Sequence, residues 1–230
     1  MCGLFASVGF DIDHKLFLKS LDQLSNRGPD NSNHFFGQGF ALGHTRLSII
    51  DTNTCSNQPF FSSDGSHAIV YNGELFNYKE LSTQYNLQLR TNSDTEVLLE
   101  LYKLLGPSCI ELLNGMFSFL IINLTTHKIF VARDRYGIKP LYWSFCSSGY
   151  LFSSEIKPLL NFVSKKPNLD SISQYYRLRS IEAPNTIYQS IYEFKPGHYF
   201  YNDTSHKYWS FSPAPVHHFD SEEFSSILVS

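Results

Sequence analysis

The stretch MFSFLIINLTTHKIFVAR (residues 116–133) decides the fold class of this chain. Its two apolar runs, residues 116–123 and 128–133, have the length of β-strands and flank the short connection LTTH. A connection this short joins neighbouring antiparallel strands. Two further runs, residues 141–145 and 150–153, lie on either side of a short polar stretch and predict a second pair. The second half of the chain is therefore expected to form antiparallel sheet.

Outside this block, strands and helices come in groups and do not alternate strictly. Further strands are expected at residues 4–10, 35–42, 46–50, 67–71, 187–194 and 198–201. Helices are expected at residues 14–24, 94–105, 108–113 and 171–177. The grouping predicts an α+β fold, with helices on the outer faces of sheets, and argues against a doubly wound parallel sheet.

Two local motifs have a defined structural interpretation. The sequence SDTE (residues 93–96) has the pattern of a capping box, so Ser93 should cap a helix while Glu96 reaches back to the Ser93 N–H. The stretch RDRYGIKP (residues 133–140) is a charged turn between predicted strands. For this turn a buried ion network is favoured over a catalytic role.

Composition excludes several classes of protein. A net charge of −3 gives no general attraction to nucleic acid or to an anionic membrane, so neither partner is expected. No apolar stretch approaches the length of a membrane span, and the apolar run at residues 2–10 lacks the basic flank of a signal peptide. The four cysteines form no C-x-x-C pair, and no metal site is predicted. These features indicate a cytoplasmic protein in a reducing compartment.

Cys2 directly follows the initiator methionine. If Met1 is removed, Cys2 carries a thiol and an α-amine, and an α-amine with a pKa of about 7.7–8.0 can accept the thiol proton. Only the thiolate is a good nucleophile, so this residue would contain a nucleophile and its base. Gly3 would leave room for a substrate beside the thiol. Taken alone, Cys2 is more simply explained as an incidental cysteine near a terminus.

Three further positions offer what such a nucleophile requires. Asn72-Gly73 has the two donors of an oxyanion hole, although Asn-Gly between apolar residues is also a strong hairpin signal. Arg46 could bind a carboxylate through its planar fork, or make a structural ion pair. Asp94 could hold an ammonium group, or stabilise the positive end of its helix. Together with a thiol, these groups describe a site for an α-amino acid.

The order of the motifs and their amino-acid sequences resemble those of the glutaminase domain of the glutamine-hydrolysing asparagine synthetases. The resemblance rests on MCGLF, RGPD, GHTRLSIID, NQP, YNGELFNY, SDTEVLL, LNGMFSF, ARDRYGIKPLY, SSEIK and KPGHY, and extends from residue 2 to about residue 209. Thr45 departs from the arginine that is more frequent in this family, which is expected to affect local packing only. The family implies a four-layer α-β-β-α sandwich of mainly antiparallel sheets, the N-terminal-nucleophile hydrolase architecture.

The resemblance also implies a catalytic mechanism. Cys2, as the new N-terminus, is the nucleophile, and Asn72 with the Gly73 N–H forms the oxyanion hole. The implied reaction hydrolyses L-glutamine to glutamate and ammonia through a thioester on Cys2.

For substrate binding, the resemblance implies two charged contacts. Arg46 binds the α-carboxylate of glutamine, and Asp94 binds its α-ammonium group, with Glu74 nearby. The residues expected to line the pocket between these contacts are Leu47, Ser48, Ile49 and Ile50.

The implied domain organisation extends beyond this chain. Residues 1–210 are expected to form the glutamine amidotransferase domain, which needs no cofactor or metal. Residues 211–230 are expected to form a linker and the start of a helix that leads to a synthetase domain. That ATP-pyrophosphatase domain, in cis or as a separate subunit, would bind ATP and Mg and make asparagine from aspartate. The chain is therefore expected to be the front part of a longer protein, and a homodimer is left open.

Two alternatives remain at this stage. The same glutaminase could serve a different acceptor, in the amidation of a surface polysaccharide or a secondary metabolite. A degenerate glutaminase could instead act as a binding module, for example if Met1 stays in place.

Overall fold

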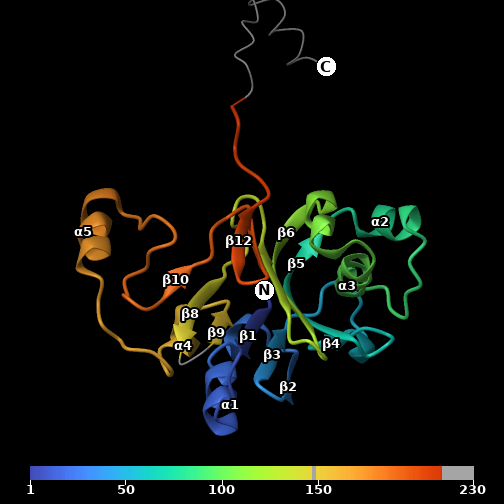
Figure 1. The fold of residues 1–230 in the computed structure, drawn as a ribbon, viewed down its shortest axis with the longest axis horizontal. Coiled ribbons are helices and arrows are strands. Elements are labelled where there is room, and N and C mark those ends of the chain that lie inside the picture. Colours follow the sequence, from blue (N-terminus) through green and yellow to red (C-terminus); the bar gives the residue numbers. More distant parts are fainter. Residues whose placement is uncertain (147–148, 214–230) are drawn as a thin grey trace, which may run out of the picture.

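The computed structural model describes residues 1–146 and 149–213. Two six-stranded sheets lie face to face, and every strand pair within them is antiparallel (Figure 1). The first sheet has the order β10 (Tyr192–Glu193), β8 (Tyr142–Cys146), β9 (Gly149–Ser153), β1 (Gly3–Val8), β3 (Phe40–Arg46) and β2 (Asn31–Gly37). The second has the order β12 (Thr204–Lys207), β11 (His198–Tyr201), β7 (Ile129–Arg133), β6 (Gly115–Asn123), β5 (His67–Leu75) and β4 (Phe60–Phe61).

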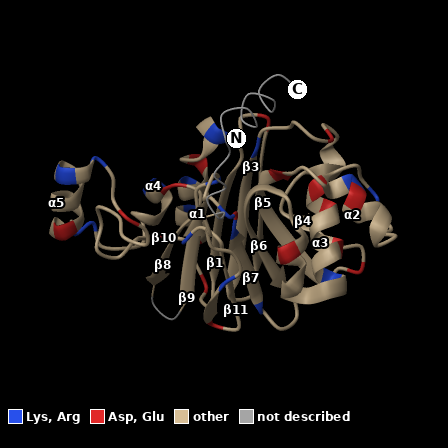
Figure 2. Ribbon diagram, turned by 90° about the horizontal axis from the view of Figure 1, so that it is seen from above, with Lys and Arg blue, Asp and Glu red and all other residues tan. Residues whose placement is uncertain are grey.

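Helices cover the outer side of each sheet. The first sheet is covered by α1 (His14–Asp22) and α4 (Ile156–Leu159), and the second by α2 (Tyr78–Gln84) and α3 (Asp94–Leu105). Figure 2 shows the resulting order of helix, sheet, sheet and helix, with α5 (Leu169–Leu178) lying apart from the sandwich. The connections contain the short 3-10 helices η1 (Ser25–Arg27), η2 (Thr54–Ser56) and η3 (Gly106–Leu112). The expected four-layer α-β-β-α sandwich is therefore confirmed.

The predicted hairpin at residues 116–133 is present as β6 and β7, with Ile122 opposite Ile129. Side chains of a strand alternate between its two faces, and both faces of β6 are buried. Phe119 and Ile121 pack toward α3, whereas Leu120 and Ile122 pack between the two sheets. This double burial explains why the strand is a continuous apolar run.

Three sequence-based strand boundaries are wrong. The stretch 35–42 is not one strand, because Gly39 has a positive φ of 72° and makes the turn between β2 and β3. The predicted strand at residues 46–50 ends at Arg46, since Ser48 N–H donates to the Asp30 carboxylate and not to a neighbouring strand. Within 187–194 only β10 forms. The structure also contains α2 and β12, which the sequence pattern did not predict.

The first turn of α3 has the expected N-cap but lacks the second hydrogen bond of the predicted capping box. Ser93 caps the helix as predicted, accepting a hydrogen bond from Thr95 N–H at 3.1 Å. Glu96 does not reach back to Ser93. Its carboxylate accepts from the main-chain N–H groups of Arg90 and Thr91, at 2.9 and 2.7 Å. The segment before α3 is thereby tied to the helix, which holds the first turn in place.

The charged turn after β7 is a buried structural network, as the sequence indicated. Arg133 donates to the main-chain oxygens of Gly137, Lys139 and Phe194 and pairs with Glu193 at 2.6 Å. Asp134 is 1% exposed, and its carboxylate accepts four main-chain N–H groups, from Phe117, Tyr136, Ile138 and Lys139.

Asp134→Ala is expected to lower the free energy of unfolding by about 3–5 kcal/mol, because it leaves buried N–H donors without acceptors. Chemical denaturation measures the loss. The control is Arg135→Ala, a change at a partly exposed neighbour, which should stay within about 0.5 kcal/mol of wild type. Equal stabilities of the two variants would contradict the structural role of Asp134.

The predicted linker and helix at residues 211–230 lie outside the described residues from position 214 onward. Among the described residues, no helix is long and apolar enough to cross a bilayer.

Candidate active site

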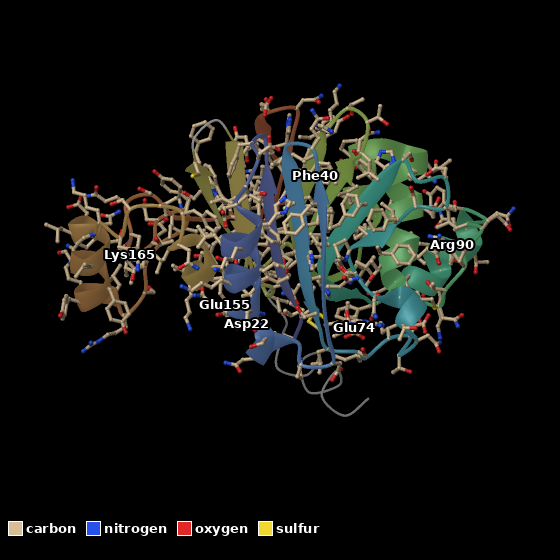
Figure 3. All side chains as sticks on the ribbon, turned by 90° about the horizontal axis from the view of Figure 1, so that it is seen from below. Asp22, Phe40, Glu74, Arg90, Glu155 and Lys165 are labelled. Atoms are coloured by element: carbon tan, nitrogen blue, oxygen red, sulfur yellow. The ribbon has the colours of Figure 1, made fainter. Side chains whose placement is uncertain are left out.

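A cavity of about 90 Å³ lies at one end of the sandwich, and strand ends from both sheets meet there. Its lining contains every residue expected to catalyse the reaction or bind the substrate except Ser48: Cys2, Arg46, Leu47, Ile49, Ile50, Asn72, Gly73, Glu74 and Asp94. In Figure 3, Glu74 lies at one end of the sheets and Phe40 at the other. The antiparallel register explains the convergence, because Gly3 lies opposite Thr45 and so places Cys2 beside Arg46.

The thiol of Cys2 is held against the start of the loop that follows β3. Leu47 N–H donates to Sγ at 3.4 Å, and Sγ lies 3.6 Å from Leu47 O. Arg27 Nε donates to the main-chain oxygen of Cys2 at 2.9 Å, and its guanidinium pairs with Glu155 at 3.2 Å. The main chain at the candidate nucleophile is thus anchored from a different segment of the chain.

Burial raises the pKa of the Cys2 thiol above its usual value. The hydrogen bond with Leu47 and the positive charges of the amino terminus, Arg46 and Lys139 oppose this increase without cancelling it. At neutral pH the thiol is therefore protonated in this state of the chain, and a base is required for it to attack a carbonyl.

Gly3 does not have the structural role that was expected from the sequence. A Cβ on Gly3 would lie 2.6 Å from Thr45 Oγ1 and 2.9 Å from Leu24 Cβ. Thr45 Oγ1 in turn donates to Leu24 O at 3.0 Å. Gly3 therefore makes room for packing within the protein and not for a substrate.

Asn72 and Gly73 lie inside a continuous strand, so the hairpin interpretation of this dipeptide is wrong. The pairing of β5 with β6 runs without a break through Leu75 opposite Gly115. Asn72 is 1% exposed and lies on the same face of β5 as Val70, whose side chain packs between the sheets. Its buried Nδ2 has no hydrogen-bond partner among the described residues.

Gly73 supplies a second donor on the cavity side. Alternate residues of a strand turn their main-chain groups to the same edge. Gly73 N–H thus points the same way as Tyr71 N–H and Leu75 N–H, which donate to Gln58 and Asp94 rather than to β6. A Cβ at position 73 would lie 2.5 Å from Met116 O, so the strand requires glycine here.

Asp94 is a carboxyl side chain at the start of α3, and only 4% of it is exposed. Its Oδ2 accepts from the Tyr71 hydroxyl at 2.8 Å and from Leu75 N–H at 3.0 Å. Burial raises the pKa of this carboxyl, while those two hydrogen bonds lower it, and the nearby charge of Glu74 adds a smaller increase. Asp94 therefore offers a buried carboxylate whose desolvation a bound cation would offset.

Arg46 does not form the structural ion pair that the sequence offered as an alternative, since none of the ion pairs among the described residues involves it. Its Nη1 donates to Asn53 O at 2.9 Å and to Asn57 Oδ1 at 2.7 Å, and its Nη2 donates to Ile50 O and Asp51 O. All four N–H groups of the fork thus hold the loop after β3. Unless the guanidinium breaks its hydrogen bonds to this loop, only its Nε–H is left to bind a ligand. No carboxylate among the described residues pairs with Arg46.

The cavity also contains residues that the sequence did not single out. Gln58, Tyr71 and Lys139 line it, and Lys139 is 8% exposed. Gln58 Oε1 accepts from Tyr71 N–H at 2.6 Å, and its Nε2 lies 3.4 Å from Thr95 Oγ1. The sequence did contain a signal for these three residues, because they lie in the motifs NQP, YNGE and IKP, on which the family resemblance rests.

This arrangement suits a small zwitterion. A thiol, the N–H donors of Asn72 and Gly73, a buried carboxylate and nearby cations surround a cavity of amino-acid size rather than nucleotide size. Within residues 1–146 and 149–213, no three His, Cys, Asp or Glu side chains are grouped so that they could hold a metal ion.

Comparison with known proteins agrees with this geometry. The sequence model of the family described as "Glutamine amidotransferase domain" matches residues 1–209. Asparagine synthetase [glutamine-hydrolyzing] 3 of Bacillus subtilis is 35% identical over 211 residues, which cover 86% of this chain and 34% of that protein. Amidase chry2 of Gibberella zeae is 36% identical over 205 residues, covering 83% of this chain and 29% of that protein. The chain thus spans about a third of the length of these relatives.

A solved structure shares the fold at lower sequence identity. Glutamine phosphoribosylpyrophosphate amidotransferase from Bacillus subtilis, solved with ADP and GMP, matches with a TM-score of 0.65 and 21% identity. The match covers 90% of this chain and 49% of that one. With the match of the family over residues 1–209, these findings place the chain in the class II glutamine amidotransferase family, as a glutaminase domain related to those of asparagine synthetases.

Proposed function

We propose that this domain hydrolyses L-glutamine to glutamate and ammonia, with Cys2 as the nucleophile. The observation that carries the proposal is the buried Asn72 Nδ2, which has no partner in the part of the chain that the structure describes and lines the same cavity as the Cys2 thiol. An unpaired buried donor costs stability, so its retention is explained by a charge that develops there during reaction. Asp94 in the same cavity supports an α-amino acid as the substrate.

The reaction proceeds in two steps. The Cys2 thiolate attacks the side-chain carbonyl carbon of glutamine, and the oxygen becomes an oxyanion between Asn72 Nδ2 and Gly73 N–H. The C–N bond then breaks, and the leaving nitrogen takes the proton that the α-amine received from the thiol, which releases ammonia. In the second step, water adds to the γ-glutamyl thioester with the α-amine as base. Glutamate leaves and the thiol is restored.

Removal of Met1 is part of the proposal. Met1 is half-exposed and lines the cavity, and while it is attached the nitrogen of Cys2 is an amide that cannot accept a proton. The test compares glutamate release by a chain that begins at Cys2 with release by a chain whose mass shows that it retains Met1. We expect turnover from the first chain only. Inactivity of the processed chain would contradict the proposed function and favour a binding module.

Asp94→Asn is expected to raise the KM for glutamine by about 10–100-fold, because the α-ammonium loses a charge-assisted hydrogen bond. The change in kcat should be smaller. Initial rates over a range of glutamine concentrations separate the two effects. Asp170→Asn is the matched control, since Asp170 also lies in the first turn of a helix but far from the cavity. An unchanged KM in Asp94→Asn would remove Asp94 from the substrate site.

For the whole protein we propose asparagine as the product. Support comes from relatives named as glutamine-hydrolysing asparagine synthetases, which are about three times as long as the matched domain. An ATP-pyrophosphatase domain, in cis or as a subunit, would receive the ammonia and use ATP and Mg to activate aspartate. Relatives named as amidases make other acceptors the alternative. An assay of the full-length enzyme with aspartate, glutamine and ATP decides between them, because only the first acceptor yields asparagine.

A further inference from the structure

His44 is a buried histidine that the proposed mechanism does not use. It lies on β3, two residues before Arg46, and is 0% exposed. Its Nε2 lies 2.9 Å from the main-chain oxygen of Tyr71 on β5. This contact joins the first sheet to the second close to the cavity. His44 itself does not line the cavity.

The partner of His44 defines its chemical form. A carbonyl oxygen only accepts hydrogen bonds, so Nε2 carries the ring proton. Burial, with a smaller contribution from the charge of Arg46, lowers the pKa of His44 to about 4, against the opposing effect of the Tyr71 contact. The ring is neutral at physiological pH, and its Nδ1 is a buried acceptor without a partner in the part of the chain that the structure describes. Such a group can orient a neighbour but does not exchange protons near neutral pH.

Tyr71 needs this contact because, among the described residues, the neighbouring strand on that side does not extend as far as Tyr71. β4 is two residues long and pairs Phe60 with Ile69, so the ladder stops before Tyr71. Two side chains take over from the missing strand. Gln58 accepts from Tyr71 N–H at 2.6 Å, and His44 donates to Tyr71 O. Both main-chain groups of Tyr71 are therefore satisfied at an open edge of the sheet.

The Tyr71 carbonyl and the Asn72 N–H belong to one planar peptide group. A rotation of this group would move the Asn72 side chain and the Gly73 N–H, which are the two proposed oxyanion donors. We propose that His44 is a positioning residue for the glutaminase reaction, fixing the Tyr71–Asn72 peptide so that these donors face the Cys2 thiol. This inference rests on the proposed function, and it assigns a role to the histidine of the GHTR motif.

A matched pair of variants tests the role. In His44→Gln the amide nitrogen can take the place of Nε2 and donate to Tyr71 O, whereas the shorter side chain of His44→Asn cannot reach it. We expect His44→Asn to lower kcat by about 10–100-fold, as for other small misplacements of catalytic groups. The KM for glutamine should stay within about threefold, because Asp94 is untouched. His44→Gln should restore kcat to within about fivefold of wild type with an unchanged pH profile.

The outcomes separate the inference from the proposed function. Equal kcat values in the two variants, or a shifted pH profile in His44→Gln, would overturn the positioning role. Absence of turnover in the wild-type chain that begins at Cys2 would instead contradict the proposed function. Ser7→Ala, a change of another buried polar residue in the first sheet, should leave kcat unchanged. If His44→Asn does not fold, His44→Met replaces it, because methionine fills the ring volume without a donor.

Discussion

Cys2→Ala is expected to abolish glutamate release while leaving the fold and the binding of glutamine intact. Alanine removes the atom that forms the thioester, and no water is placed by this mechanism to attack the amide directly. The expected loss is at least about 10⁴-fold in kcat, comparable to the removal of a nucleophile from other hydrolases. Release of glutamate in a coupled dehydrogenase assay measures the loss, and titration calorimetry should show glutamine binding within a few-fold of wild type.

Neither Cys109 nor Cys55 can replace Cys2 as the nucleophile. Cys109 is fully buried in the core between α3 and the second sheet, and burial alone raises its pKa to about 12. Cys55 is exposed and does not line the cavity. Cys55→Ala is therefore the control, and its kcat should equal that of wild type. Turnover by Cys2→Ala above one hundredth of the wild-type rate would rule out Cys2 as the nucleophile.

The parts of the fold that the sequence predicted correctly are those in which a local sequence pattern is enough to determine the secondary structure. The run at residues 116–123 is apolar on both of its faces, and both faces are buried against separate layers. The helix that begins after Ser93 has a cap and an apolar stripe, and both are present. The strand expected at residues 46–50 was wrong because apolar Leu47, Ile49 and Ile50 line a cavity and not a sheet. Apolar spacing alone does not distinguish these two environments.

The candidate site was predictable as a set of residues but not as a set of contacts. The motifs brought Cys2, Asn72 and Asp94 into consideration, and the structure places them around one cavity. The use of the Arg46 fork could not be foreseen, because three of its four acceptors are main-chain oxygens of a loop and such oxygens leave no signature in a sequence. The same holds for His44, whose partner is the carbonyl of Tyr71.

Asn72→Ala is expected to lower kcat by about 10²–10³-fold, the usual effect of losing one side-chain donor from an oxyanion hole. The KM for glutamine should change little, since the oxyanion forms only during reaction. The stability of the variant provides a second and independent signature. Asn72 Nδ2 is buried and has no partner within residues 1–146 and 149–213, so its removal takes away an unsatisfied donor and no hydrogen bond to those residues from that atom.

The free energy of unfolding of Asn72→Ala should therefore stay within about 1 kcal/mol of wild type or increase, although most activity is lost. Asn77→Ala is the contrasting control, because its side chain donates to Leu112 O and accepts from Asn114 N–H outside the cavity. That variant should lose stability and keep kcat. If Asn72→Ala instead lost stability and activity in parallel, the amide would be a structural group. The oxyanion would then have to be stabilised by Gly73 N–H and by the cation of Lys139, which lines the same cavity.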